Sequence, residues 1–210
     1  MGIINYFTFV ITAIIFIITP GIDTMFILNK SIVQGKKAGM YATLGLNTGV
    51  LFHTLFAAFG LSLIVAQSAL AFEFIKYAGA AYLFYLGVVN LFSKDDAIQV
   101  KDGPEILPAT TKQNYISGFF TNILNPKVAI FFMAFFPQFI KPELIHSPVP
   151  FIALGLTCAV LGTTWCFLLA IFASYFSKSF TDNPKSGFWL NKISGIAFIA
   201  MGLKIALTKR

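Results

Sequence analysis

Two short segments of the chain place a proline and an ionisable side chain inside long apolar stretches. The first spans residues 19–23 and contains Asp23, and the second spans residues 122–127 and contains Lys127. Hydrocarbon can neither hydrogen-bond the backbone groups that proline frees nor solvate a charge, so such segments persist only where they face protein or a water-filled cavity. The two segments therefore predict a binding site at mid-membrane depth, built from Pro20, Gly21, Asp23, Asn122, Asn125, Pro126 and Lys127.

The side chains of these segments suit a ligand that carries charges of both signs. Asp23 can hold an ammonium group or a proton, which makes it the candidate ion-coupling residue, and Lys127 can hold a carboxylate. Each half-helix that begins after a break also directs free N–H groups and the positive end of its dipole at the cavity. The alternative is that Asp23 and Lys127 form a structural ion pair without ligand contact.

The composition places these segments in a membrane protein. Hydrophobic residues make up 57% of the chain and charged residues only 11%, and the mean hydropathy is +0.80. A membrane-spanning helix needs about 20 apolar residues. Six such stretches are expected at residues 3–28, 40–66, 69–93, 114–140, 149–176 and 188–207. The predicted fold is an all-α integral membrane protein with six transmembrane helices in a single domain, residues 1–210, in which helices 1 and 4 are broken.

The net charge of +7 reflects membrane topology rather than nucleic-acid binding, because the basic residues lie at helix ends and form no patch with exposed aromatics. Eight lysines fall on loops that share one side of the membrane, against four basic residues on the other side. The positive-inside rule then predicts that both termini lie outside. The first helix has no basic residue ahead of it and no small-residue cleavage site, so we expect it to be retained.

An internal repeat relates the two halves of the chain. Pro20 aligns with Pro126, and the segment around Gly79 aligns with the segment around Gly195. Because each half holds three helices, the halves must insert in opposite orientations, which is the inverted-repeat architecture of secondary transporters. The expected repeats are residues 1–93 and 114–210, joined by a cytoplasmic linker at residues 94–113.

The second predicted helix adds one further candidate for the site. Asn47 and His53 are six residues apart and so lie on opposite sides of that helix, which lets at most one of them face the cavity. An amide can contact a zwitterion without changing protonation, so Asn47 is the predicted substrate-binding residue. His53 is interpreted as a hydrogen-bonded packing residue, with a role in the cavity as the alternative.

The two cysteines and two histidines predict neither a disulfide nor a metal site. Cys158 and Cys166 are eight residues apart on one predicted helix, a rise of roughly 12 Å, which is too far for a disulfide. We interpret both as small apolar core residues. No Cys-x-x-Cys pair occurs, and His53 and His146 are far apart in sequence. No metal or other cofactor is expected.

Several segments together resemble the lysine-exporter (LysE/RhtB) family of small bacterial amino-acid efflux proteins, over nearly the whole chain. The similar segments are residues 19–24, 34–39, 45–49 with His53, 79–83 with Gly87, and 118–127, and the last of these continues into the phenylalanine-rich run 131–139. One position departs from the family pattern, because the first break usually reads Pro-Gly-Pro and Ile22 replaces its second proline. The acidic residue that follows survives as Asp23.

This resemblance implies the activity and the location of the protein. Family membership implies export of amino acids or close derivatives from the cytoplasm, coupled to proton entry by antiport. It implies a multi-pass protein of the bacterial cytoplasmic (inner) membrane whose partners are the amino-acid substrate, protons and the lipid bilayer. A homodimer is compatible with the sequence, which assigns no interface.

Three other classes of protein are less consistent with these residues. A divalent-cation exporter of similar inverted-repeat architecture is the main alternative, but it should place carboxylates in both repeats, and the second break instead carries amides and a lysine. An enzyme would need a nucleophile with a base, or a metal triad, at membrane depth, and neither set occurs. A scaffold protein would not need charges at that depth.

Overall fold

The computed structural model describes residues 2–61, 69–92, 109–173 and 184–207. Within these ranges all regular secondary structure is helical, apart from an isolated antiparallel bridge between Ile3 and Ile140. The α-helices are α1 (Tyr6–Ile18), α2 (Ile22–Gln34), α3 (Lys36–Leu55), α5 (Ala69–Phe92), α6 (Thr111–Ile123), α7 (Pro126–Ile130), α8 (Pro148–Ile171) and α10 (Pro184–Leu207). Short helical segments of other types follow two of these helices. The segment η1 (Phe56–Leu61) follows α3, and the segments η2 (Phe131–Phe135), η3 (Phe136–Phe139) and η4 (Pro142–Leu144) follow α7.

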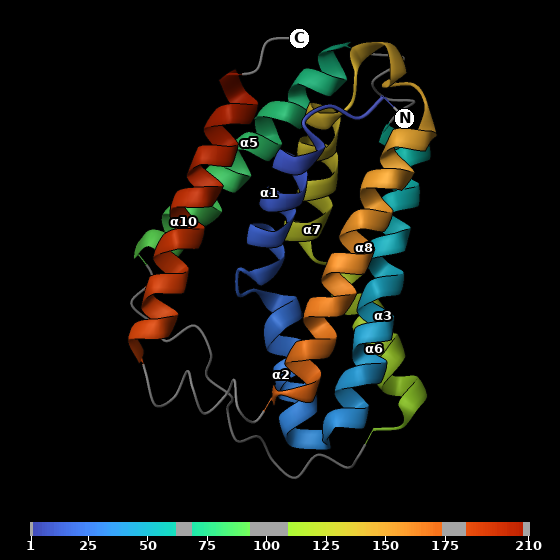
Figure 1. The fold of residues 1–210 in the computed structure, drawn as a ribbon, viewed down its shortest axis with the longest axis vertical. Helices are drawn as coiled ribbons and strands as arrows, with labels where there is room; N and C mark the ends of the chain where they lie inside the picture. Colours follow the sequence, from blue (N-terminus) through green and yellow to red (C-terminus); the bar gives the residue numbers. More distant parts are fainter. Residues whose placement is uncertain (1, 62–68, 93–108, 174–183, 208–210) are drawn as a thin grey trace.

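The long elements run alternately up and down (Figure 1), so that α1 begins at the end of the molecule where α10 finishes. In the described part of the chain, three helices are long and apolar enough to cross a membrane by themselves. Two bent helix pairs, α1 with α2 and α6 with the segment after it, raise that number to five if each pair is one span. The sixth span, expected at α10, and the inverted relation of the two halves remain predictions.

The two predicted helix breaks are confirmed. The axes of α1 and α2 meet at 51°, and the axis of α6 meets that of the following segment, residues 126–139, at 49°. Proline lacks the N–H that would continue the helical hydrogen bonds, and it clashes with the preceding turn, so each helix ends just before its proline and a new one begins. The first break forms although Ile22 stands where the family pattern has a second proline.

Several helix boundaries differ from the expected ones, and the first broken span ends at Gln34 rather than residue 28. The second span begins at Lys36 rather than residue 40, directly after Gly35, whose φ of 85° suits glycine. Helix α6 begins at Thr111, three residues before its predicted start at residue 114, because Thr110 and Gln113 cap it reciprocally. Helix α10 begins at Pro184 rather than residue 188. The rest of the predicted linker, residues 94–108, lies outside the described residues.

Glycines allow the helices of the two halves to approach each other closely. A Cβ added to Gly45 of α3 would overlap the carbonyl oxygen of Tyr115 in α6, and one added to Gly118 of α6 would overlap that of Ala42. Helices α5 and α10 meet in the same way at Gly87 and Gly195. Small residues at these contacts are typical of helix packing in membranes, where close backbone approach supplies the attraction.

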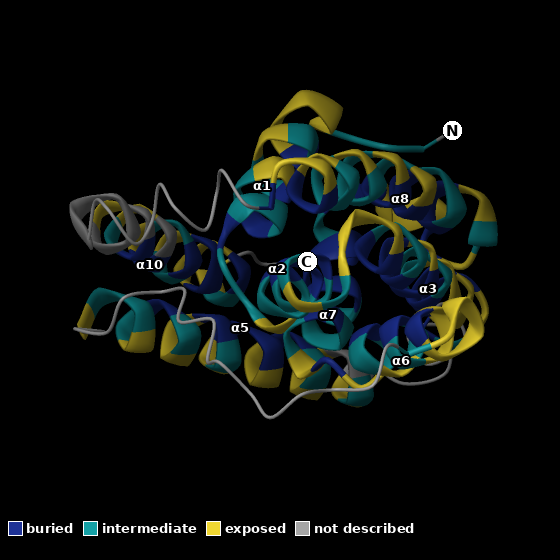
Figure 2. Cartoon of the chain, turned by 90° about the horizontal axis from the view of Figure 1, so that it is seen from below, coloured by how far each residue is buried: buried dark blue, intermediate teal, exposed yellow. Residues whose placement is uncertain are grey.

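Phenylalanine side chains are prominent in the hydrophobic core, and apolar side chains also cover the outside of the molecule. The core cluster contains Phe9 and the run from Phe131 to Phe139, whose rings stack or meet edge to face. Figure 2 shows the buried residues facing inward and the exposed ones on the outer surfaces of the helices. Many of the exposed side chains are large and apolar, including Phe7, Phe74, Phe92, Leu124 and Trp189. Such an apolar exterior matches a lipid environment.

Candidate functional site

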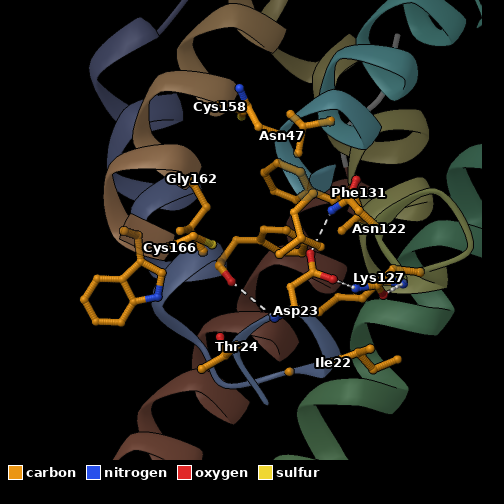
Figure 3. Close-up of a pocket in the computed structure, with 18 of the residues that line it drawn as sticks. Ile22, Asp23, Thr24, Asn47, Asn122, Lys127, Phe131, Cys158, Gly162 and Cys166 are labelled. Carbon is orange, nitrogen blue, oxygen red and sulfur yellow. Dashed lines mark hydrogen bonds between the residues drawn. The ribbon is translucent and has the colours of Figure 1, made fainter. Parts of the chain in front are cut away.

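The two helix breaks lie on one cavity in the middle of the molecule (Figure 3). About 730 Å³ of space, including the mouth of the cavity, is free of protein atoms there. The walls are the two breaks, the middle of α3 and the middle of α8. Of the predicted site residues, six line this cavity: Gly21, Asp23, Asn47, Asn122, Asn125 and Lys127.

Asp23 connects the two breaks. It lies in the first turn of α2, and each of its carboxylate oxygens accepts one hydrogen bond from an amide of the other break. The donors are the Nδ2 atoms of Asn122, at 2.8 Å, and Asn125, at 3.0 Å. Hydrogen bonds to an ionised acceptor are stronger than neutral ones. The state of the Asp23 carboxyl group therefore influences how firmly the two breaks hold together.

Lys127 caps the C-terminus of α1 and does not form an ion pair with Asp23. Its Nζ donates to the carbonyl oxygens of Phe16, at 3.2 Å, and Thr19, at 3.1 Å. It also lies 4.7 Å from the ring centroid of Phe16 and 5.3 Å from that of Phe198. A cation there compensates the negative end of the α1 dipole. No ion pair joins Asp23 and Lys127 in the described structure, so the alternative of a direct structural pair receives no support.

The N-termini of α2 and α7 differ in whether a side chain caps their free N–H groups. Asn125 caps α7, because its side-chain oxygen accepts a hydrogen bond from the N–H of Lys127 at 3.0 Å. Helix α2 begins after Gly21, which has no side chain to cap it. The first-turn N–H groups of a helix have no partner within the helix. The expectation that both breaks offer free N–H groups is therefore met best by α2, where Gly21 also gives Lys127 room.

Asn47 and His53 face different cavities, as expected from their spacing on α3. Asn47 lines the cavity, and its side-chain oxygen is buried without a hydrogen-bond partner among the described residues. His53 lies behind the second break, where its Nε2–H donates to the carbonyl oxygen of Asn122 at 3.2 Å. It lines a second cavity together with Phe52, Phe56 and Phe132. His53 thus positions the backbone of Asn122 and does not face the main cavity.

Sequence reasoning missed the wall that α8 contributes. The cavity is also lined by Cys158, Gly162, Thr163, Trp165 and Cys166. Both cysteines are free thiols, and they face this space instead of serving only as core residues. The available signal was the spacing of four between Cys158, Gly162 and Cys166, which puts small residues on one helix face. By contrast, Pro20 and Pro126 shape the breaks but do not line the cavity.

Gly49 of α3 supports the Asn122 side chain, which leads to a first prediction. A Cβ at Gly49 would lie 2.6 Å from Asn122 Oδ1 and 2.8 Å from Asn122 Cβ, closer than real contacts allow. Gly49→Ala should therefore displace the Asn122 amide from Asp23 and lower both thermal stability and transport. The matched control is Gly60→Ala, whose Cβ would meet Phe56 at an ordinary 3.4 Å. Equal behaviour of the two variants in a thermal-shift and transport assay would contradict this role.

The residues of the cavity do not resemble a metal site. In the described ranges no group of three His, Cys, Asp or Glu side chains is arranged to hold a metal ion. The second break contributes amides and the ammonium group of Lys127, which repels cations. The divalent-cation alternative therefore receives no support from the geometry.

Comparison with known proteins assigns the chain to a family. Residues 14–209 match the family described as LysE type translocator. The chain is 36% identical to the membrane protein YrhP of Bacillus subtilis over 203 residues, covering 93% of this chain and 95% of YrhP. It is 30% identical to a membrane protein of Vibrio cholerae, with both chains covered in full.

A third relative carries a functional name. The chain is 27% identical to the leucine efflux protein of Klebsiella pneumoniae over 206 residues, covering 98% of this chain and 96% of that protein. No solved structure matches the fold. Its helices are apolar enough to span a membrane, its relatives are membrane proteins, and the family match covers nearly all of it. The chain is therefore a multi-pass membrane protein that belongs to the LysE type translocator family.

Proposed function

We propose that this protein is a secondary transporter that exports amino acids from the cytoplasm by exchange with protons. The observation that carries the proposal is the cavity between two broken helices, which presents one carboxylate and one ammonium group within a single space. Membership of a translocator family and the name of the Klebsiella relative support an amino acid as the substrate. The proposed location is the bacterial inner membrane, with both termini outside.

An α-amino acid matches the polar half of the cavity. Its carboxylate would approach the uncapped N-terminus of α2 at Gly21, next to Lys127. Helix N-termini bind anions through free N–H groups and the dipole. Its ammonium group would approach the two carboxylate oxygens of Asp23 and the unpartnered side-chain oxygen of Asn47. An ammonium ion offers three donors and no acceptor, so it pairs well with three oxygens.

Proton coupling follows from competition at Asp23. A proton on this carboxyl neutralises the charge that would attract the substrate ammonium group, so proton and substrate bind at the expense of each other. Protonation also turns one oxygen into a donor, which conflicts with the amide donors of Asn122 and Asn125. Proton uptake from outside would thus both release substrate and loosen the contact between the two breaks. That is the linkage an antiporter needs.

Transport by purified protein in lipid vesicles tests the proposal. Vesicles preloaded with labelled amino acids should release them by a saturable route that is accelerated when a proton gradient is imposed in the opposite direction. One proton entering per zwitterion is worth about 2.3 kcal/mol at 100 mV, which sustains roughly a 50-fold substrate gradient. Folded protein that moves no amino acid would refute the proposed substrate class. Transport that ignores the proton gradient would refute antiport alone.

A further inference from the structure

Helix α8 forms a wall of the cavity that is distinct from the two charged breaks. Cys158, Gly162 and Cys166 follow one another at intervals of four residues, so they lie on one face of the helix. Figure 3 shows this face directed at the cavity, across from Asp23 and Asn47. All three residues line the cavity. The wall therefore faces the groups that the proposed function assigns to the ammonium end of the substrate.

The space in front of α8 is open at Gly162. A Cβ added to Gly162 would have no described atom beyond its own helix within 4 Å. Seven residues earlier on the same helix, a Cβ added to Gly155 would overlap the side chain of Thr54. Packed interiors leave few voids larger than a water molecule. Gly155 is thus a packing glycine, whereas Gly162 borders space that a ligand can occupy.

The chemistry of this wall is uncharged. Among the described residues that line the cavity, Asp23 and Lys127 are the charged ones, and both lie on the breaks. Near Gly162, α8 contributes two thiols, the hydroxyl of Thr163 and the indole of Trp165. A second charge on the substrate would have no counter-charge on this side, and desolvating an unpaired charge is costly. An uncharged side chain of moderate size suits the wall.

A separate observation indicates that the cavity takes a ligand. The side chain of Asn122 is 1% exposed, and its Oδ1 atom has no hydrogen-bond partner among the described residues. Buried polar atoms are nearly always paired, and the side-chain oxygens of Asn47 and Thr163, two residues that line the cavity, are also unpaired, so a donor bound in the cavity would satisfy them. Asn122 lies on the second break, across the cavity from α8. The backbone end of a substrate held there would direct its side chain at α8.

We propose that the α8 face around Gly162 is the side-chain subsite of the transporter, and that Gly162 sets the size of the largest amino-acid side chain accepted. This inference rests on the proposed function, which it refines to neutral amino acids with uncharged, mainly apolar side chains. A glycine here leaves the volume that the substrate side chain fills. Any side chain placed at position 162 would occupy that volume in its stead.

The test is to enlarge position 162 and measure which substrates lose affinity. Gly162→Ala and Gly162→Val should keep the affinity for alanine and weaken that for leucine, methionine and phenylalanine by about tenfold or more, since one methylene in such a pocket is worth roughly 10- to 200-fold. Affinities are read from competition by unlabelled amino acids against a labelled substrate in vesicles. Lysine and glutamate should compete poorly with every variant.

The matched control is Val160→Leu on the same helix, where Val160 is 66% exposed on the outer surface. This variant should leave the order of affinities unchanged. A parallel change for all substrates in Gly162→Val, or no change at all, would overturn the inference. If the unaltered protein binds no amino acid, the proposed function fails first, and the two failures are therefore distinguishable.

Stability measurements keep the test interpretable. Gly162→Ala adds a methyl group to open space and a better helix former, so its melting temperature should equal or exceed that of the unaltered protein. Gly155→Ala should lower the melting temperature, because its Cβ overlaps Thr54. A loss of stability in Gly162→Ala comparable to that in Gly155→Ala would show that position 162 is packed, and it would overturn the subsite.

Discussion

Asp23→Asn is expected to abolish proton-driven export while leaving a folded protein that still exchanges substrate for substrate. Asparagine has nearly the same shape as aspartate, so one amide of Asn122 or Asn125 can still donate to its oxygen. It cannot take up a proton, and Asp23 is the carboxyl group among the described residues of the cavity. Gradient-driven efflux should therefore fall by roughly 100-fold or more, because an amide cannot replace an ionisable acceptor.

Exchange assays separate this coupling role from a general loss of binding. Counterflow of labelled against unlabelled amino acid needs no net proton movement, so it should persist in Asp23→Asn with a reduced apparent affinity. Glu143→Gln is the matched control, since Glu143 is exposed in the turn η4 and is not among the residues that line the cavity. Proton-driven export that survives in Asp23→Asn would contradict the coupling role. Loss of both activities would assign Asp23 to substrate binding without a separate role in coupling.

The breaks and the family could be predicted from the sequence because their causes are local. Proline at positions 20 and 126 prevents a continuous helix whatever surrounds it, and the following half-helices begin at Ile22 and Pro126 in the structure. The position of Asp23 and Lys127 at these breaks also follows from the sequence alone. The hydrogen-bond partners of Asp23 could not be predicted in this way. Asn122 and Asn125 lie about one hundred residues from Asp23 in the sequence, and their pairing depends on how the two halves pack.

The contribution of α8 to the cavity could not be predicted from the sequence, for a different physical reason. Its residues are apolar on all sides, so periodicity does not distinguish a face that contacts lipid from one that contacts a cavity. Cys158 and Cys166 have the small, apolar character of core residues, and Gly162 has that of a packing glycine. Only the rotation of α8 against α3, fixed where Gly155 meets Thr54, decides which face lines the cavity.

Lys127→Met should weaken both the fold and the binding of substrate. The Nζ of Lys127 donates to two carbonyl oxygens at the end of α1, and their residues Phe16 and Thr19 are buried. A methionine fills a similar volume but donates nothing, so the buried carbonyl oxygen of Phe16 loses this hydrogen bond, a loss that costs about 1 to 3 kcal/mol of unfolding free energy. The same ammonium group lies beside Gly21, where the substrate carboxylate is expected. Affinity should fall by roughly 10- to 100-fold, as for a lost charge-assisted hydrogen bond.

The loss of stability and the loss of substrate affinity can be measured separately. The first changes the fraction of protein that is folded, and the second changes how well the folded protein binds substrate. Thermal unfolding gives the first, and substrate affinity per folded molecule, measured well below the melting temperature, gives the second. Lys112→Met, on the exposed first turn of α6, removes the same charge without these contacts and should change neither. If Lys127→Met lowers stability but binds substrate with unaltered affinity, Lys127 serves the helix end alone. The carboxylate would then depend on the N–H groups of α2, and the first break would hold the anion without a cationic side chain.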